Sequence, residues 1–233
     1  MVGPGEAPRL PSLLGVTIRR SFVVGRLSLI IGCGMVMFYS AAFGVTGTLF
    51  VTLGALILPI FAVTGGVGGA LVFANDRMKG VLEYLVAYGI SPRQILRNTL
   101  IAGLVQVSLV VLLGVSAGTA TYLASGHALT LALPEALLAY TLPMSYLTVT
   151  LMTVLGVFWT SLASPRSGMN SPLGVLPLIG VVPPTVVLVL VEALRAYAVP
   201  VLLGSELVLA LLVLGLLFRT DRLMPPVRLL SSA

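Results

Sequence analysis

Long apolar runs, interrupted by short charged segments, make up most of this chain. A helix needs about 20 apolar residues to cross the hydrocarbon core of a bilayer. By this measure the pattern predicts six membrane-spanning helices. Their approximate bounds are Leu27–Phe43, Thr46–Ala74, Thr99–Leu123, Ala136–Ala163, Pro172–Val191 and Val199–Phe218. The predicted fold is therefore an all-α, multi-pass integral protein of the cell membrane.

Composition supports a membrane protein. Hydrophobic residues are 58% of the chain and charged residues 9%, and the mean hydropathy is +1.12. A soluble domain of this length needs more charge to cover its surface. We expect an N-terminal cytoplasmic segment over residues 1–26, a six-span transmembrane domain over 27–218 and a cytoplasmic C-terminal tail over 219–233.

The basic residues predict the orientation of the chain. With the N-terminus inside, twelve of the thirteen lysines and arginines lie inside, and only Arg195 lies outside. Cytoplasmic loops are enriched in these residues, so their distribution supports both the number of spans and the orientation. It also explains a pI of about 10.0 without a nucleic-acid partner.

Two segments outside the spans have patterns of their own. Ser12–Arg26 is expected to form an interfacial helix on the inner surface, since Leu14, Ile18 and Phe22 share a face. Glu192–Glu206, between the fifth and sixth spans, is apolar but interrupted by charges, Pro200 and glycine. It is compatible with re-entrant helices and equally with an ordinary outer loop.

A cluster of small residues lies in the second span, over Thr64–Gly69. Small residues allow helix backbones to approach closely in membranes. Adjacent glycines also weaken a helix. We expect the cluster to mediate packing, with a functional bend as the alternative.

The residues that are missing exclude several functions. One histidine and one cysteine do not make an ordinary zinc site, and we expect no metal, cofactor or catalytic residue in this chain. Lys79 is the only lysine and follows Met78, so a phosphate-binding Gly-Lys-Ser/Thr motif cannot exist. Any ATP must be bound by another chain. No acid or base is expected in the middle of a span, which argues against ion-coupled transport.

The charged segment 75–98, between the second and third spans, has the most specific pattern. Lys79–Tyr88 is predicted to form a short helix with Val81, Leu85 and Tyr88 on one apolar stripe. Gly89 then follows as a C-terminal capping glycine. This short helix is expected to lie at the inner surface.

A second helix is predicted to start directly after this glycine. Ser91 is its expected N-cap, Pro92 its first residue, and Gln94 completes a capping box. Ile90 and Ile95 stand at the positions of a hydrophobic staple. The result is a stiff corner that passes a push on the short helix into the third span.

This segment resembles the coupling region of the type-2 permease family of ABC transporters, whose members are mostly exporters. The residues Gly80-Val81-Leu82-Glu83, after the charged Asp76–Lys79, stand where the family has Gly-Thr-Leu-Glu. Valine replaces the usual threonine. The family's interfacial helix, six spans, coupling helix and re-entrant helices are similar to the elements expected over the whole chain.

The resemblance implies a permease subunit of an ATP-driven exporter. It implies two copies of a separate ATP-binding subunit, which hold ATP and magnesium, and a second permease subunit, identical or different. Glu83, Arg77 and Lys79 would organise the contact with the ATPase, while apolar residues pack it. The expected ATPase-coupling residues are Asp76, Arg77, Lys79, Gly80, Val81, Leu82, Glu83, Leu85, Ser91, Pro92 and Arg93.

Other readings stay open. GISPRQILRNTL also resembles the loop of type-I ABC importers, with Glu83 and Gly89 six apart, but importers place that loop later in the chain. A membrane scaffold without transport, or a secondary carrier or channel, would need no ATPase partner.

Overall fold

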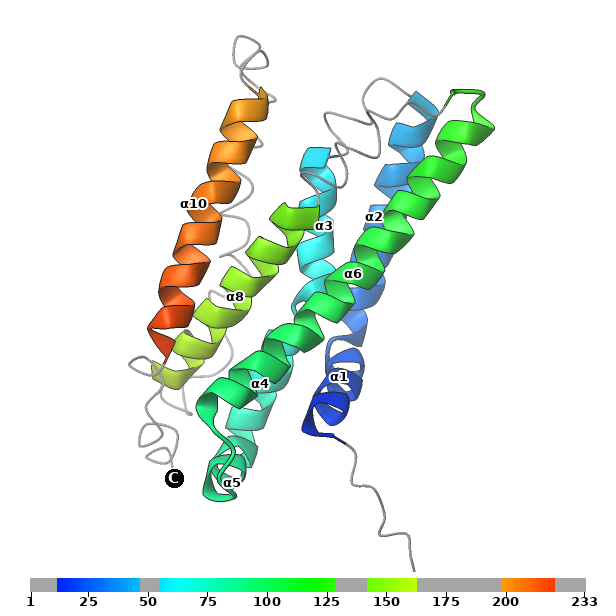
Figure 1. The fold of residues 1–233 in the computed structure, drawn as a ribbon. Helices are drawn as coiled ribbons and strands as arrows, with labels where there is room; N and C mark the ends of the chain where they lie inside the picture. Colours follow the sequence, from blue (N-terminus) through cyan, green and yellow to red (C-terminus); the bar gives the residue numbers. More distant parts are fainter. Residues whose placement is uncertain (1–11, 47–54, 129–141, 163–197, 221–233) are drawn as a thin grey trace, which may run out of the picture.

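The computed structural model describes residues 12–46, 55–128, 142–162 and 198–220, and in these ranges the regular structure is entirely helical (Figure 1). The predicted all-α class is thus confirmed for this part of the chain. Its helices are α1 Leu13–Val24, α2 Arg26–Thr46, α3 Ala55–Gly66, α4 Gly68–Met78, α5 Val81–Ala87, α6 Pro92–Ala124, α8 Leu142–Leu162 and α10 Ala198–Phe218.

The long helices lie side by side in an elongated bundle. Helix α2 packs along α6, α3 packs against both and against α8, and α10 packs on α8 (Figure 1). Helices α2 and α6 run one way along the bundle, and α3, α8 and α10 run the other way (Figure 1). Helices α1 and α5 lie at the end where α2 and α6 begin, so the short elements gather at one end.

The lengths and composition of the described helices bear on the predicted spans. One helix, Pro92–Ala124, is long and apolar enough to cross a membrane, and it contains the third predicted span. Helices α1 and α2 meet at 71° and add a second only if the bent pair is taken as one span. The fifth predicted span, Pro172–Val191, lies outside the described residues, as do parts of the second and fourth. The number six therefore stays a prediction.

A helix is present where the interfacial helix is predicted, as α1. Ser12 caps it, since the Gly15 amide donates a hydrogen bond to Ser12 Oγ over 3.1 Å. The expected face of Leu14, Ile18 and Phe22 is half-buried, and Ser21 is the buried residue of this helix. Helix α1 packs against α4 and α6, so it belongs to the bundle, and its position at a membrane surface stays a prediction.

The small residues of the second span do mediate close packing. A Cβ added to Gly32 of α2 would stand 2.7 Å from Gly65 Cα of α3, too near for any side chain. The same segment also breaks the helix, because Val67 separates α3 from α4. Packing is therefore observed as expected, together with an interruption that the alternative had suggested.

Helix α10 corrects two expectations. Its range covers the sixth predicted span, and residues 198–206 form its first turns, so this part of Glu192–Glu206 belongs to a continuous helix. Residues 192–197 lie outside the described ranges. Glu206 is the ninth of the 21 residues of α10. Glu206 thus lies within the helix that covers the sixth predicted span, where no acid was expected.

Candidate functional site

The charged segment 75–98 forms a short helix between two long ones. Helix α4 runs on to Met78, four residues beyond the predicted end of the second span. It ends at a turn in which Gly80 takes a left-handed conformation, with φ +69°. Helix α5 therefore begins at Val81 and ends at Ala87, and the predicted range Lys79–Tyr88 is too long at both ends. The physical reason is that the Gly80 conformation breaks the helical hydrogen-bond ladder.

The predicted corner after α5 is confirmed. Gly89 has φ +82°, its amide donates to the Val86 carbonyl over 2.9 Å, and the Ile90 amide donates to the Leu85 carbonyl over 3.0 Å. This pair of bonds satisfies the last carbonyls of α5. Helix α6 then starts as expected, with Pro92 first and the Gln94 amide donating to Ser91 Oγ over 3.2 Å.

A buried apolar cluster anchors α5 to the bundle. Leu82 is 2% exposed and lies in this cluster with residues of α4, α6 and α8, while α10 packs at its edge. Ile95, the expected partner of Ile90 in the hydrophobic staple, belongs to it, and Ile90 packs against it. Its buried members are Phe73, Leu82, Ile95, Leu96, Val154 and Val157. Because side chains of all these helices pack together there, a shift of α5 would displace residues of the other helices as well.

The outer side of α5 is aromatic. Tyr84 is 68% and Tyr88 85% exposed, and Met78 before the turn is exposed as well. The predicted apolar stripe is therefore wrong at Tyr88, whereas Leu85 is half-buried as expected. The helix ends at Ala87, so Tyr88 lies beyond its last residue and does not continue the half-buried side of Val81 and Leu85. The spacing of four between the tyrosines was the sequence signal for this face.

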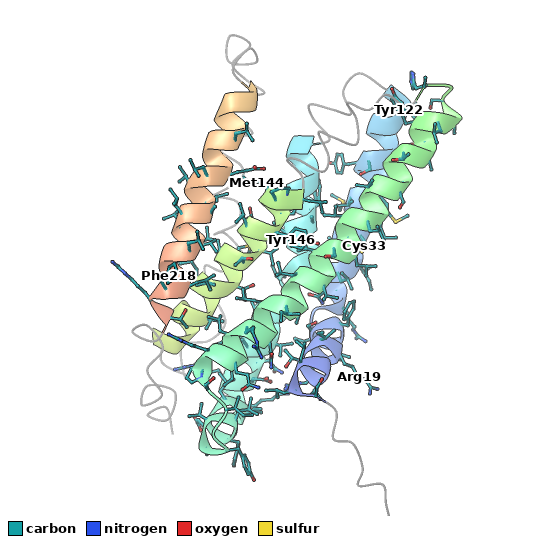
Figure 2. The ribbon with its side chains drawn as sticks, in the orientation of Figure 1. Arg19, Cys33, Tyr122, Met144, Tyr146 and Phe218 are labelled. Atoms are coloured by element: carbon teal, nitrogen blue, oxygen red, sulfur yellow. The ribbon has the colours of Figure 1, made fainter. Side chains whose placement is uncertain are left out.

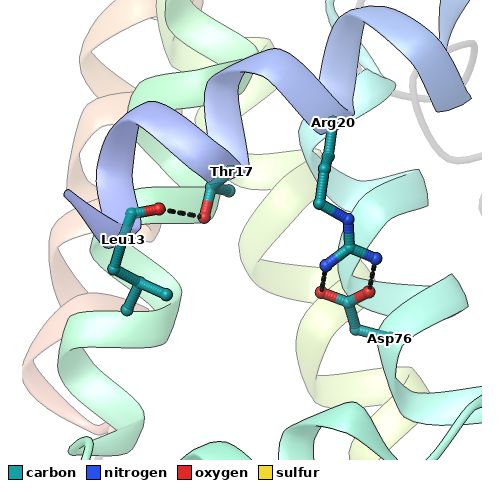
Figure 3. A network of polar contacts seen from close by, with 4 residues as sticks. All are labelled: Leu13, Thr17, Arg20 and Asp76. Carbon is teal, nitrogen blue, oxygen red and sulfur yellow. Dashed lines mark hydrogen bonds and ion pairs between the residues drawn. The ribbon is translucent and has the colours of Figure 1, made fainter. Parts of the chain in front are cut away.

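Asp76, one of the expected coupling residues, pairs with a residue outside segment 75–98. Arg20 of α1 donates from Nη1 to Asp76 Oδ2 over 2.9 Å and from Nη2 to Oδ1 (Figure 3). Asp76 is buried, and Arg20 is about one-third exposed. Burial raises the pKa of the Asp76 carboxyl, and the hydrogen bond and charge of Arg20, with the charge of Lys79, oppose the rise.

Sequence reasoning missed Arg20. The available signal was that Asp76 is the only acid at the inner end of the second span, in a chain with an excess of arginines. Only the packing of α1 against α4 showed which arginine it meets.

Arg77, Gly80 and Glu83 come together at the start of α5. Glu83 Oε2 lies 3.4 Å from the position of a Cβ on Gly80. Burial lowers the pKa of the Arg77 guanidinium, and the negative charge of Glu83 opposes that shift. The structure thus brings together two of the three predicted organising charges, while Lys79 is exposed beside them.

The remaining expected residues differ in position. Val81 is half-buried, Ser91 and Arg93 are exposed, and Pro92 is half-buried at the corner. Residues of α1, α4, α5 and α6 line a cavity of about 20 Å³, with Asp76, Asn98 and Thr99 among them. That volume suits a single water molecule. Among the described residues, no three His, Cys, Asp or Glu side chains are grouped to hold a metal ion.

Comparison of the chain with protein-family models, with curated proteins and with solved structures gave no match.

Proposed function

We propose that this chain is the transmembrane permease subunit of an ATP-driven exporter of the type-2 ABC family. A separate ATP-binding subunit acts on it through α5. The chain itself has no Gly-Lys-Ser/Thr motif of the kind that cradles ATP phosphates, because its only lysine follows Met78. ATP and magnesium therefore belong to the partner, of which two copies would serve a pair of permeases.

The observation that carries this proposal is the two-sided character of α5. Its inner side is fastened by Leu82 to a cluster that includes α4, α6 and α8. Its outer side presents Tyr84 and Tyr88. Exposed aromatic side chains at the centre of an interface often contribute most of its binding energy. A helix built this way binds a partner on one side and transmits its displacement on the other.

Helix lengths and charges support a membrane location. Helices α2, α8 and α10 have 21 residues each. At 1.5 Å per residue each extends about 32 Å, close to the thickness of a hydrocarbon core, while among the described helices Pro92–Ala124 is the one that is both long and apolar enough to cross a membrane by itself. The basic residues of the described chain gather at the end of the bundle that holds α5, which we call the charged end (Figure 1). They are Arg19, Arg20, Arg26, Arg77, Lys79, Arg93, Arg97 and Arg219. This distribution fits a cytoplasmic charged end.

The mechanism follows from these contacts. Closure of the ATP-binding subunits moves α5, with the charges of Arg77 and Glu83 holding the turn before it. The corner at Gly89 and Ser91 is held by capping hydrogen bonds, so it transfers that motion rigidly to α6. The apolar cluster transfers the motion of α5 to α4, α8 and α10. The helices along which the substrate passes are reoriented as a result.

Co-purification tests the proposal. The chain is purified from membranes with its ATP-binding partner, and the affinity of the pair is measured for the double variant Tyr84→Ala/Tyr88→Ala. We expect binding to weaken at least tenfold, in line with a loss of about 2 kcal/mol for a buried aromatic contact. Phe218→Ala is the matched control, because Phe218 is 84% exposed and lies at the same end of the bundle (Figure 2).

Glu83→Ala separates assembly from coupling. We expect the complex to form while its substrate-stimulated ATP hydrolysis falls. Absence of any ATPase partner would favour the scaffold or the secondary carrier. Chemical labelling of Tyr84 and Tyr88 from the outer side of sealed cells would reject the proposed orientation.

A further inference from the structure

Glu206 is an isolated ionisable residue within the long helices. The helical residues 27–46, 55–75, 98–124, 142–162 and 198–218 contain a single acidic or basic side chain, that of Glu206. It follows Ala198 by about 12 Å along α10 and precedes Phe218 by about 18 Å. In the proposed membrane orientation it therefore lies at hydrocarbon depth, where ionisable residues are costly and usually functional.

Glu206 lies on the side of α10 that faces the bundle. Leu209 and Val213, three and seven residues later, are 7% and 5% exposed, whereas Leu207 and Leu211 are more than half exposed. Spacings of three and seven place Glu206 above the buried residues on one helix face. Its Oε1 atom is buried and has no hydrogen-bond partner in the described structure.

The neighbouring helix supplies no compensating charge. Helix α10 packs on α8, whose 21 residues include no Asp, Glu, Lys, Arg or His. Tyr146 is the one titratable side chain of α8, and its hydroxyl is hydrogen-bonded to Ser108 of α6. Glu206 as a whole is half-buried, but an ionised carboxyl group with one oxygen buried and unpaired is unfavourable unless something else neutralises it. Within the described chain, no fixed cation does so.

We propose that Glu206 is a binding site for a positive charge supplied from outside the chain. It holds a proton in the conformation seen here, and it exchanges that proton for the cationic group of a transported organic cation. On exchange the proton leaves the carboxyl oxygen for water and the cation pairs with the carboxylate, so the net charge of the site is unchanged. This inference rests on the proposed transport function and names its substrate class.

An organic cation fits the surroundings better than a metal ion. Metal ions such as Ca²⁺ need several oxygen ligands, and the other acids of the described residues, Asp76 and Glu83, belong to α4 and α5 at the charged end. Leu203, one turn before Glu206, is 54% exposed and offers apolar surface beside the carboxyl group. A lipophilic ammonium or phosphonium ion can use both the charge and this surface.

Two measurements on the full chain in lipid nanodiscs, without the ATPase, test the proposal. Infrared spectroscopy at neutral pH should show the carbonyl stretch of a protonated carboxyl group. That band should vanish in Glu206→Gln and persist in Glu83→Gln, which alters a half-buried acid at the charged end of the bundle. Binding of tetraphenylphosphonium should tighten about tenfold for each unit by which the pH rises, as long as each bound cation releases one proton. It should weaken at least tenfold in Glu206→Gln and recover in Glu206→Asp.

Each outcome decides the matter. The band together with pH-dependent binding supports the proposal. If the carbonyl band is present but tetraphenylphosphonium does not bind, Glu206 binds protons only. That result overturns the proposed exchange of a proton for an organic cation. Absence of the band at neutral pH means that the carboxylate is ionised, which overturns the whole inference. Size-exclusion profiles of each variant show whether it is folded. Since no ATPase is present, these failures are distinct from a failure of the chain to co-purify with one.

Discussion

Arg20 on α1 donates two hydrogen bonds to the carboxylate of Asp76 at the end of α4, joining segments 56 positions apart in the chain. The pair connects the N-terminal helix to the segment that leads into α5 (Figure 3). Burial disfavours the charged Asp76, and Arg20 offsets part of that cost. Removing either partner alone should therefore have unequal effects.

Arg20→Met should destabilise the chain by about 2 kcal/mol at neutral pH, because it leaves a buried carboxylate without its counter-charge. Solvent around the partly exposed Arg20 keeps the loss below that of a fully buried pair. Adding Asp76→Asn should recover most of it. Denaturation of the purified variants in one detergent measures both changes, and equal losses in the single and double variants would contradict this account.

The loss in Arg20→Met should depend on pH. Without Arg20, burial raises the pKa of Asp76 further above its ordinary value of 3.8. The folded chain then binds this proton more tightly than the unfolded chain, so stability is present below pH 3.8 and declines as pH rises to the folded pKa. The deficit relative to wild type should thus be smallest in acid and largest at neutral pH. The variant Arg20→Met/Asp76→Asn should lack this trend in a series of melting temperatures.

Gly32→Ala should destabilise the contact between α2 and α3. Its new methyl group would meet the backbone of Gly65 at 2.7 Å, and a backbone cannot rotate away as a side chain can. We expect a cost of about 1–3 kcal/mol from overpacking. Gly34→Ala, two residues along α2, has open space around its Cβ position and is the matched control. Similar melting temperatures for the two variants would show that the helices separate easily here.

Gln106→Met should leave stability unchanged or raise it. Gln106 is fully buried on α6, and neither polar atom of its amide has a hydrogen-bond partner in the described structure. Replacing such an amide by an apolar group of similar volume removes a desolvation cost and loses no bond. A clear fall in melting temperature would instead show that buried water satisfies the amide.

Gly89→Ala tests the corner between α5 and α6. A left-handed conformation costs a non-glycine residue about 1 kcal/mol, so the corner should loosen. ATP hydrolysis by the assembled complex should then respond less to substrate. Gly126→Ala is the matched control, because Gly126 has a similar φ of +79° and open space at the opposite end of α6. An equal effect of both variants on hydrolysis would mean general destabilisation and not coupling.

The corner was predictable because every signal in it is local. Gly89, Ser91, Pro92 and Gln94 act on backbone groups within a few residues, so spacing alone indicates the structure. The start of α5 was less predictable, since nothing in the residues around Gly80 distinguishes a left-handed turn from a first helical turn. The outward orientation of Tyr88 also depended on where the bundle lies relative to α5.

By itself, the sequence determined that the described chain is helical, where its apolar helices run, and that a capped corner joins α5 to α6. These properties follow from hydrophobic periodicity and from backbone hydrogen bonds made over short distances along the chain. Tertiary structure alone decided that Arg20 pairs with Asp76, that Leu82 packs α5 against α4, α6 and α8, and that Glu206 lies on the face of α10 toward the bundle. Such relationships depend on which helix faces pack together, and packing is set by shape and burial summed over the whole bundle.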